Sequence, residues 1–179
     1  MLQIISFFWR LCLLKEAPSK VPNSTFAALA TFTIYLIIAF TILLNTRPEQ
    51  SFLKIFSSTI IGITIQLSLT YVLLKFKNRE YTYIPAVCSL LGTNAIMLLI
   101  LFPFNLTLLY AENSNLLILA NSFSLVCLGW WLAIAGFIYH KSADVSMVQG
   151  SCLALLIEII SVLTATKFSI STTLPQVLS

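Results

Sequence analysis

Residues 147–166 read MVQGSCLALLIEIISVLTAT, and this stretch decides the fold class. Its length matches the roughly 20 apolar residues that a transmembrane helix needs. A charged residue at mid-membrane, here Glu158, costs about 2.5–3.5 kcal/mol on the insertion scale, whereas each Leu, Ile or Val returns about 0.3–0.6 kcal/mol. Eight such residues surround Glu158, so the stretch is predicted to insert as a membrane-spanning helix.

Four further apolar stretches of similar length precede this one, and polar turns separate them. They cover about residues 25–44, 55–74, 84–102 and 116–139, and Pro103 is expected to close the third. The sequence therefore predicts an all-α polytopic membrane bundle of about five transmembrane helices within residues 25–166.

The composition supports a membrane location. Of the 179 residues, 59% are hydrophobic and 9% are charged, whereas soluble domains are about 45–50% apolar and about 25% charged. The net charge of +4 comes from ten Lys and Arg against six Asp and Glu. Because the positive residues cluster in short turns between apolar stretches, membrane lipid is the expected partner and nucleic acid is not.

Residues 1–24 are expected to form an amphipathic helix followed by a proline-containing turn. Residues 1–14 would reach only about 21 Å as a helix, against about 30 Å of hydrocarbon. Gln3, Ser6 and Arg10 form one narrow polar stripe. We expect this helix to lie along the membrane surface, and the alternative is a partly inserted start to the bundle. Residues 167–179 are expected to be a short extracytoplasmic tail.

The Lys and Arg residues predict the orientation, because cytoplasmic loops carry more of them. An intracellular N-terminus places seven on the cytoplasmic side: Arg10, Lys15, Lys20, Lys75, Lys77, Arg79 and Lys141. It leaves three on the other side: Arg47, Lys54 and Lys167. We therefore predict a cytoplasmic N-terminus and an extracytoplasmic C-terminus. Lys75, Lys77 and Arg79 follow the second span directly and are expected to contact anionic lipid.

Three polar side chains fall near the middle of the predicted spans. Glu158 accompanies Gln66 of the second span and Asn94 of the third, and both amides could donate hydrogen bonds to its carboxyl group. One interpretation is a proton- or ligand-responsive intramembrane cluster. The other is structural, with each interhelical hydrogen bond contributing about 0.6–2 kcal/mol. The structural interpretation is favoured because no second ionisable group accompanies Glu158.

All five glycines lie inside predicted spans. Glycine weakens a helix unless backbones approach closely, so these positions are expected to be sites of helix packing. They are Gly62, Gly92, Gly129, Gly136 and Gly150.

The sequence offers no recognisable catalytic or metal-binding motif. It contains one histidine and four cysteines without paired spacing, and no metallopeptidase, nucleophile-elbow or phosphate-binding motif. We therefore expect no enzymatic activity, metal or cofactor.

Several short stretches resemble a known family. They are residues 10–14 (RLCLL), Ala17-Pro18, residues 21–24 (VPNS), residues 131–136 (WLAIAG) and His140. With the amphipathic start and five closely spaced spans, the chain resembles the Yip-family membrane proteins, and more narrowly a group of small proteobacterial inner-membrane proteins. The resemblance implies a helical bundle in a bacterial inner membrane and brings no catalytic residues.

Two functions follow from these observations. The first is a non-enzymatic scaffold or accessory protein of the Yip-family type, which packs with another membrane protein or organises lipid locally. The alternative is a subunit of a small oligomeric transporter or channel built around Glu158, Gln66 and Asn94. The expected partner is accordingly a membrane protein or further copies of the chain.

Overall fold

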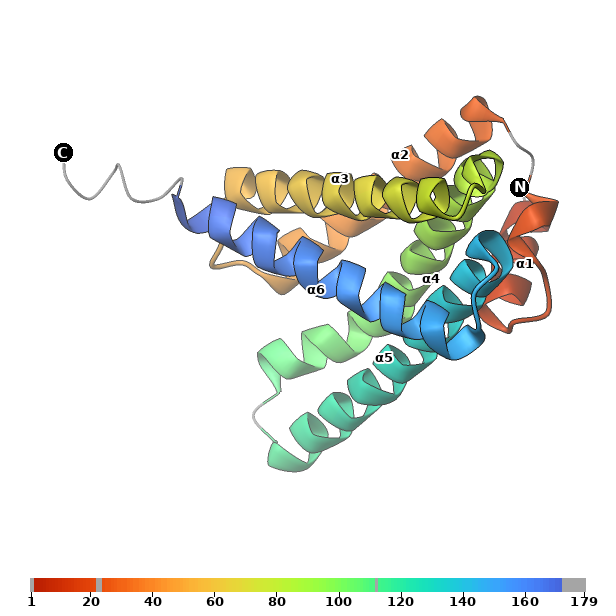
Figure 1. The fold of residues 1–179 in the computed structure, drawn as a ribbon. Helices are drawn as coiled ribbons and strands as arrows, with labels where there is room; N and C mark the ends of the chain where they lie inside the picture. Colours follow the sequence, from red (N-terminus) through yellow and green to blue (C-terminus); the bar gives the residue numbers. More distant parts are fainter. Residues whose placement is uncertain (1, 22–23, 112, 172–179) are drawn as a thin grey trace.

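The computed structural model describes residues 2–21, 24–111 and 113–171, and these fold entirely into helices and turns (Figure 1). The elements in chain order are α1 (Leu2–Cys12), η1 (Pro18–Lys20), α2 (Thr25–Thr46), α3 (Phe52–Phe76), η2 (Glu80–Thr82), α4 (Tyr83–Tyr110), α5 (Ser114–Ala143) and α6 (Met147–Ser171). No β-strand occurs among the described residues, and the predicted all-α class is confirmed.

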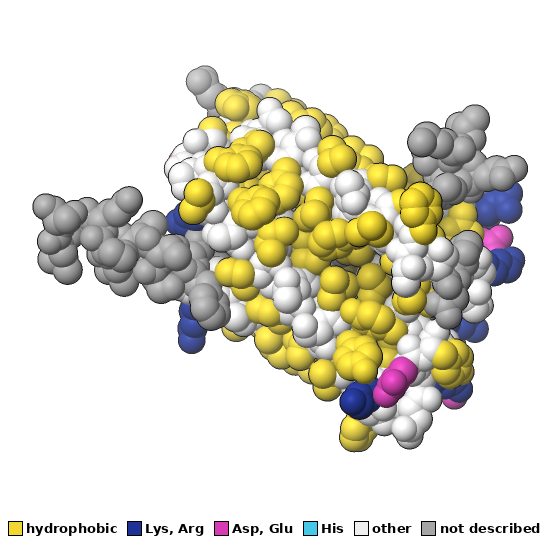
Figure 2. Space-filling view, turned by 90° about the horizontal axis from the view of Figure 1, so that it is seen from above, with side chains coloured by type: hydrophobic (Ala, Val, Ile, Leu, Met, Phe, Trp, Pro, Cys, Tyr) yellow, Lys and Arg dark blue, Asp and Glu magenta, His cyan; other side chains and the backbone are white. Residues whose placement is uncertain are grey.

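Helices α2 to α6 are long and apolar enough to cross a membrane. They contain 22 to 30 residues, which at 1.5 Å per residue gives about 33–45 Å, against about 30 Å of hydrocarbon. Figure 2 shows hydrophobic side chains over the middle of the visible face and charged side chains towards its edges. The chain is therefore an integral membrane protein with five candidate spans.

Helix α4 lies at the centre of the bundle. It packs along α2 and α5, whereas α6 packs along α5 and α3. Residues 85–93 of α4 are buried without interruption. Figure 1 shows that the α4–α5 pair and the α3–α6 pair meet near the α5–α6 turn and diverge towards the α4–α5 loop. The bundle is consequently tight at one end and splayed at the other.

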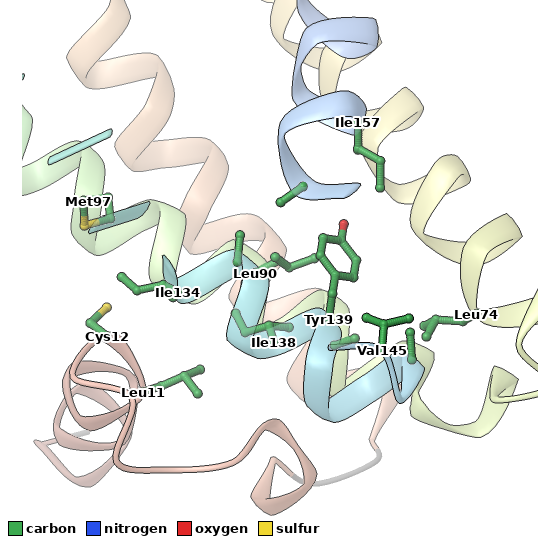
Figure 3. Close-up of a cluster of buried hydrophobic side chains, with 14 of the residues drawn as sticks. Leu11, Cys12, Leu74, Leu90, Met97, Ile134, Ile138, Tyr139, Val145 and Ile157 are labelled. Carbon is green, nitrogen blue, oxygen red and sulfur yellow. The ribbon is translucent and has the colours of Figure 1, made fainter. Parts of the chain in front are cut away.

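The apolar core lies at the tight end (Figure 3). Tyr139 of α5 is 1% exposed, and its hydroxyl oxygen lies 2.9 Å from Oγ1 of Thr70 in α3. Thr70 donates its only hydroxyl proton to the carbonyl oxygen of Gln66 at 2.8 Å, so Tyr139 is the donor in the longer-range bond. This buried bond ties α5 to α3 inside the core.

Two turns are joined at the same end of the bundle. Arg79 donates from Nη2 to Oδ2 of Asp144 at 2.7 Å. The single hydroxyl proton of Thr82 lies between two carbonyl oxygens, that of Arg79 at 2.7 Å and that of Ser142 across the turn at 3.0 Å. Asp144 adopts a left-handed backbone conformation with φ of 55° as α5 ends. The turn after α3, with its cluster of cations, thus lies against the turn after α5. We call this end of the bundle the basic end.

Helix α1 packs against the bundle as well as exposing a polar face. Ser6, Trp9 and Arg10 are exposed, whereas Leu11 and Cys12 are fully buried; the side chain of Gln3 lies outside the described ones. The Phe8 ring covers Gly92 of α4, and Trp130 of α5 donates from Nε1 to the Cys12 carbonyl oxygen at 2.9 Å. These contacts hold the buried side of α1 against α4 and α5, while its exposed side faces away from the bundle.

Two boundaries differ from the prediction. Pro103 was expected to close the third span, but α4 continues through it to Tyr110, so that prediction is wrong. Proline removes one backbone donor, yet membrane helices tolerate it where neighbouring groups satisfy the freed carbonyl. At the other boundary, α6 extends to Ser171, so residues 167–171 of the expected tail are helical. Residues 172–179 lie outside the described residues.

The turn after α1 contains a small ionic cluster, which should make the stability of the fold depend on pH. Lys20 pairs with the Glu16 carboxylate, and Nη1 of Arg10 lies 3.8 Å from Oε1 of Glu16. The hydrogen bond from Lys20, aided by the charges of Lys20 and Arg10, holds the pKa of Glu16 below its ordinary value of 4.5.

We expect Glu16→Gln to remove a small stabilisation that is fully present above that ordinary value. A carboxyl group whose pKa is lowered by folding stabilises the fold when ionised, and the effect is lost as pH falls through the folded pKa. The difference in unfolding temperature between wild type and Glu16→Gln, measured from pH 7 to 3, should therefore shrink towards zero in acid. A difference independent of pH would contradict the ionic role.

Candidate functional site

Five helices bring polar or aromatic side chains to one depth of the bundle. Counted from the basic end, each lies 10 to 12 residues along its helix, which is about 15–18 Å. They are Tyr35 in α2, Gln66 in α3, Asn94 in α4, Trp131 in α5 and Glu158 in α6. The matching depths follow from the antiparallel arrangement, in which each of these helices begins or ends at the basic end.

These five side chains line a single cavity of about 440 Å³. The remaining lining residues are Met97, Leu98, Leu101, Asn105, Asn121, Ser124, Leu125, Cys127 and Leu128. Asn105 and Asn121 lie 22 residues from the basic end of α4 and α5 respectively, or about 33 Å along each helix. The cavity therefore runs from mid-membrane depth into the splayed half of the bundle.

One hydrogen bond within the site fixes the orientation of the Asn94 side-chain amide. Trp131 donates from Nε1 to Oδ1 of Asn94 at 2.7 Å. Because an indole N–H can only donate, the amide oxygen must face Trp131, and the amide nitrogen is left to donate elsewhere. Asn94 is thus held by a neighbouring helix while it keeps two donor hydrogens for another group at the site.

Glu158 and Gln66 share the cavity without bonding to each other. Gln66 is 8% exposed, and Glu158 is partly exposed. Within the described part of the chain, no hydrogen bond joins Glu158 to Gln66 or Asn94. The three residues that the sequence suggested as a cluster therefore surround one cavity, but the direct amide-to-carboxyl bonds expected from the sequence are not formed.

The rest of the lining carries only neutral groups. Among the described residues that line the cavity, Glu158 is the only acidic one and none is Lys, Arg or His. The other polar groups are amides and hydroxyls, and Tyr35 and Trp131 contribute aromatic faces. No group of three potential metal ligands occurs in the described part of the chain. Such a lining suits the binding of a small molecule by one carboxyl group, neutral hydrogen-bonding groups and aromatic contact.

Sequence reasoning missed part of this site, although a signal was present. In α4, Asn94 and Asn105 are separated by 11 residues, which is three helical turns, so they share a face. In α5, Asn121, Ser124 and Trp131 recur at i, i+3 and i+10. A search for polar residues at helical spacing within each span would have found both faces. Tyr35 of α2 stands alone and gives no such signal.

Three of the five glycines lie at close helix contacts. A Cβ atom on Gly150 of α6 would collide with the carbonyl group of Gly136 in α5, and one on Gly136 would collide with Ser151. A Cβ atom on Gly92 of α4 would collide with the Phe8 ring. In contrast, a Cβ on Gly62 would make ordinary contact with Ala165 at 3.9 Å, and one on Gly129 would meet no atom within 4 Å. The packing expected at Gly129 is therefore absent within the described chain.

The cations expected to contact anionic lipid differ in their surroundings. Lys75 and Lys77 are exposed, and Nζ of Lys75 lies 5.9 Å from the centre of the Tyr71 ring. Arg79 is partly exposed and forms an ion pair with Asp144. Lys75 and Lys77 are thus the better placed of the three to meet lipid headgroups.

Comparison with known proteins finds no match for this chain among protein-family models, curated protein sequences or solved structures.

Proposed function

We propose that this chain is a non-enzymatic membrane protein that binds a small molecule in its intramembrane cavity, as a subunit of a small oligomeric transporter. The observation that carries the proposal is the convergence of Gln66, Asn94 and Glu158, from three helices, on one cavity of about 440 Å³. Ligand sites in proteins commonly have volumes of about 300–1,000 Å³ and a few convergent polar groups in an apolar wall.

The hydrogen bonding supports this proposal over a purely structural role. Polar groups that join membrane helices do so by bonding to one another. Among the described residues, Asn94 is the one member of the three that bonds to another side chain of the site, and Glu158 has no hydrogen bond to either amide. An ionisable residue at this depth is expensive to maintain, and it is expected to face a partner or a cavity.

The proposal extends to location and orientation. The resemblance noted above supports a bacterial inner membrane, and the excess of Lys and Arg at the basic end supports a cytoplasmic N-terminus. The cavity would then extend towards the extracytoplasmic side. Alkaline phosphatase fused after Ser179 should be active, since it folds only outside the cytoplasm; an inactive, stable fusion would contradict the orientation.

Filling the cavity tests the proposed binding function. We expect Ser124→Trp to exclude small amphiphiles from the cavity. Ser124 borders the cavity, so the indole ring of the tryptophan would occupy part of its space. Ser122→Trp is the matched control, since Ser122 is exposed on the same helix and does not line the cavity. Equilibrium dialysis of the detergent-solubilised protein would use tetraphenylphosphonium, tetraphenylborate and neutral triphenylphosphine oxide. If none of the three bound to wild type, or if Ser124→Trp bound them as wild type does, the proposal would fail.

An accessory role is a second candidate, and the geometry around Gly129 supports it. Glycine costs about 1 kcal/mol relative to alanine inside a helix, yet no atom of the described chain needs the space at this position. A helix of another membrane protein or of a second copy could approach closely there. The resemblance to Yip-family proteins supports the same role. Purification from native membranes in mild detergent should return a stoichiometric membrane partner, and repeated recovery of the monomer alone would contradict this candidate.

A further inference from the structure

We infer that the ligand of the cavity is a lipophilic cation, with Glu158 as its counter-ion. This inference rests on the proposed binding function and specifies the chemical class of the ligand. Three properties of the lining carry it: the negative charge of its one acidic residue, the acceptor oxygens of its neutral polar groups, and its aromatic rings.

The charge of the lining is one-sided. Glu158 is the only acidic residue among the described residues that line the cavity, and no lining residue can offer it a positive charge. A carboxylate at mid-membrane needs a cationic partner or a proton. A bound cation would supply the charge that the chain itself does not place there, whereas the carboxylate would repel an anion.

The neutral groups are compatible with a cation that has no hydrogen-bond donors. The lining includes the side-chain amides of Gln66, Asn105 and Asn121 and the hydroxyl groups of Tyr35 and Ser124, whose oxygens are hydrogen-bond acceptors with partial negative charge. Trp131 and Tyr35 add aromatic rings, whose faces attract organic cations. Apolar residues such as Met97, Leu101 and Leu128 complete the walls and favour an apolar body.

The location of the cavity also favours a lipophilic ligand. Its lining includes two leucines of α5 that remain open to the surroundings of the bundle, Leu125 (62% exposed) and Leu128 (49% exposed). These side chains are at membrane depth, so the cavity borders the lipid and not only the aqueous loops. A molecule that partitions into the bilayer could reach Glu158 from there.

Tetraphenylphosphonium and tetraphenylborate make a direct test, because they have the same shape and opposite charge. Wild type should bind the phosphonium, and Glu158→Gln should weaken that binding about tenfold or more, since it removes a full charge near the cation. Binding of the borate should be weaker than that of the phosphonium in wild type and should not fall in Glu158→Gln. Glu158→Asp keeps the charge and should retain the preference for the cation.

The outcomes separate this inference from the proposal on which it rests. If wild type bound both ions equally and Glu158→Gln changed neither, the cation assignment would be overturned and the binding function would stand. If Ser124→Trp failed to reduce binding, or no probe bound, the binding function itself would fall. Size-exclusion chromatography of each variant ensures that a lost signal is not a lost fold. A misfolded Glu158→Gln protein would be replaced by Glu158→Asp and Glu158→Ala for the same comparison.

Discussion

Gly150→Ala is expected to destabilise the bundle strongly, whereas the same substitution at Gly129 should not. At Gly150 the new methyl group would collide with the Gly136 carbonyl oxygen and lie 3.1 and 3.2 Å from the C and Cα atoms of Gly136. All three are backbone atoms, so no side chain can rotate away and the two helices must separate. Overpacking of this kind costs about 1–3 kcal/mol, and a rigid contact belongs at the upper end of that range.

Gly129→Ala provides the matched control on α5. Its methyl group would meet no atom within 4 Å, and alanine is the better helix former by about 1 kcal/mol. The control should therefore unfold at or slightly above the temperature of wild type, whereas Gly150→Ala should unfold well below it. Thermal unfolding in one detergent, followed by size-exclusion chromatography, would compare them. Equal unfolding temperatures for wild type and Gly150→Ala would show that the close α5–α6 crossing is absent from the folded protein.

Tyr139→Ala is the second substitution with a large expected effect. Tyr139 is 1% exposed and belongs to the core cluster at the basic end. Removing a buried aromatic side chain typically costs about 3–5 kcal/mol through lost contacts and the cavity left behind. Tyr110→Ala is the control, because Tyr110 is 69% exposed at the far end of α4, and its substitution should change stability by less than about 0.5 kcal/mol.

Tyr139→Phe would separate the two contributions of this side chain. It keeps the ring but removes the hydroxyl that donates to Thr70 at 2.9 Å, so it should cost only about 1 kcal/mol. Chemical unfolding of the three variants in mixed micelles would give the free energies. If Tyr139→Ala were no worse than Tyr139→Phe, the packing of the ring would not stabilise the bundle.

The spans could be predicted because membrane insertion depends on local sequence. A stretch of about 20 apolar residues satisfies its own backbone as a helix wherever its neighbours lie, and the five predicted stretches correspond to α2 to α6. Pro103 misled the prediction because the effect of proline depends on its surroundings. Neighbouring helices determine whether the carbonyl group that loses its donor is satisfied. The position of those helices cannot be read from sequence periodicity.

The candidate site could be predicted only in part. Glu158, Gln66 and Asn94 stand out because polar residues are costly at mid-span, and the structure places all three around one cavity. The absence of direct bonds between them depends on the splay between helix pairs, and therefore on packing at the opposite end. The same holds for α1: its polar stripe is visible in the sequence, but the fit of Phe8 over Gly92 depends on a residue 84 positions away.

The placement of the core at one end of the bundle has a dynamic consequence. Tyr139, Thr70 and the joined turns concentrate buried contacts at the basic end, whereas the opposite half surrounds a cavity. Local opening costs least where buried contacts are few, so amide protons near Asn105 and Asn121 should exchange through openings that leave the basic end intact. The two helix pairs are thus joined firmly at the basic end, and the half of the bundle around the cavity is the part expected to open first.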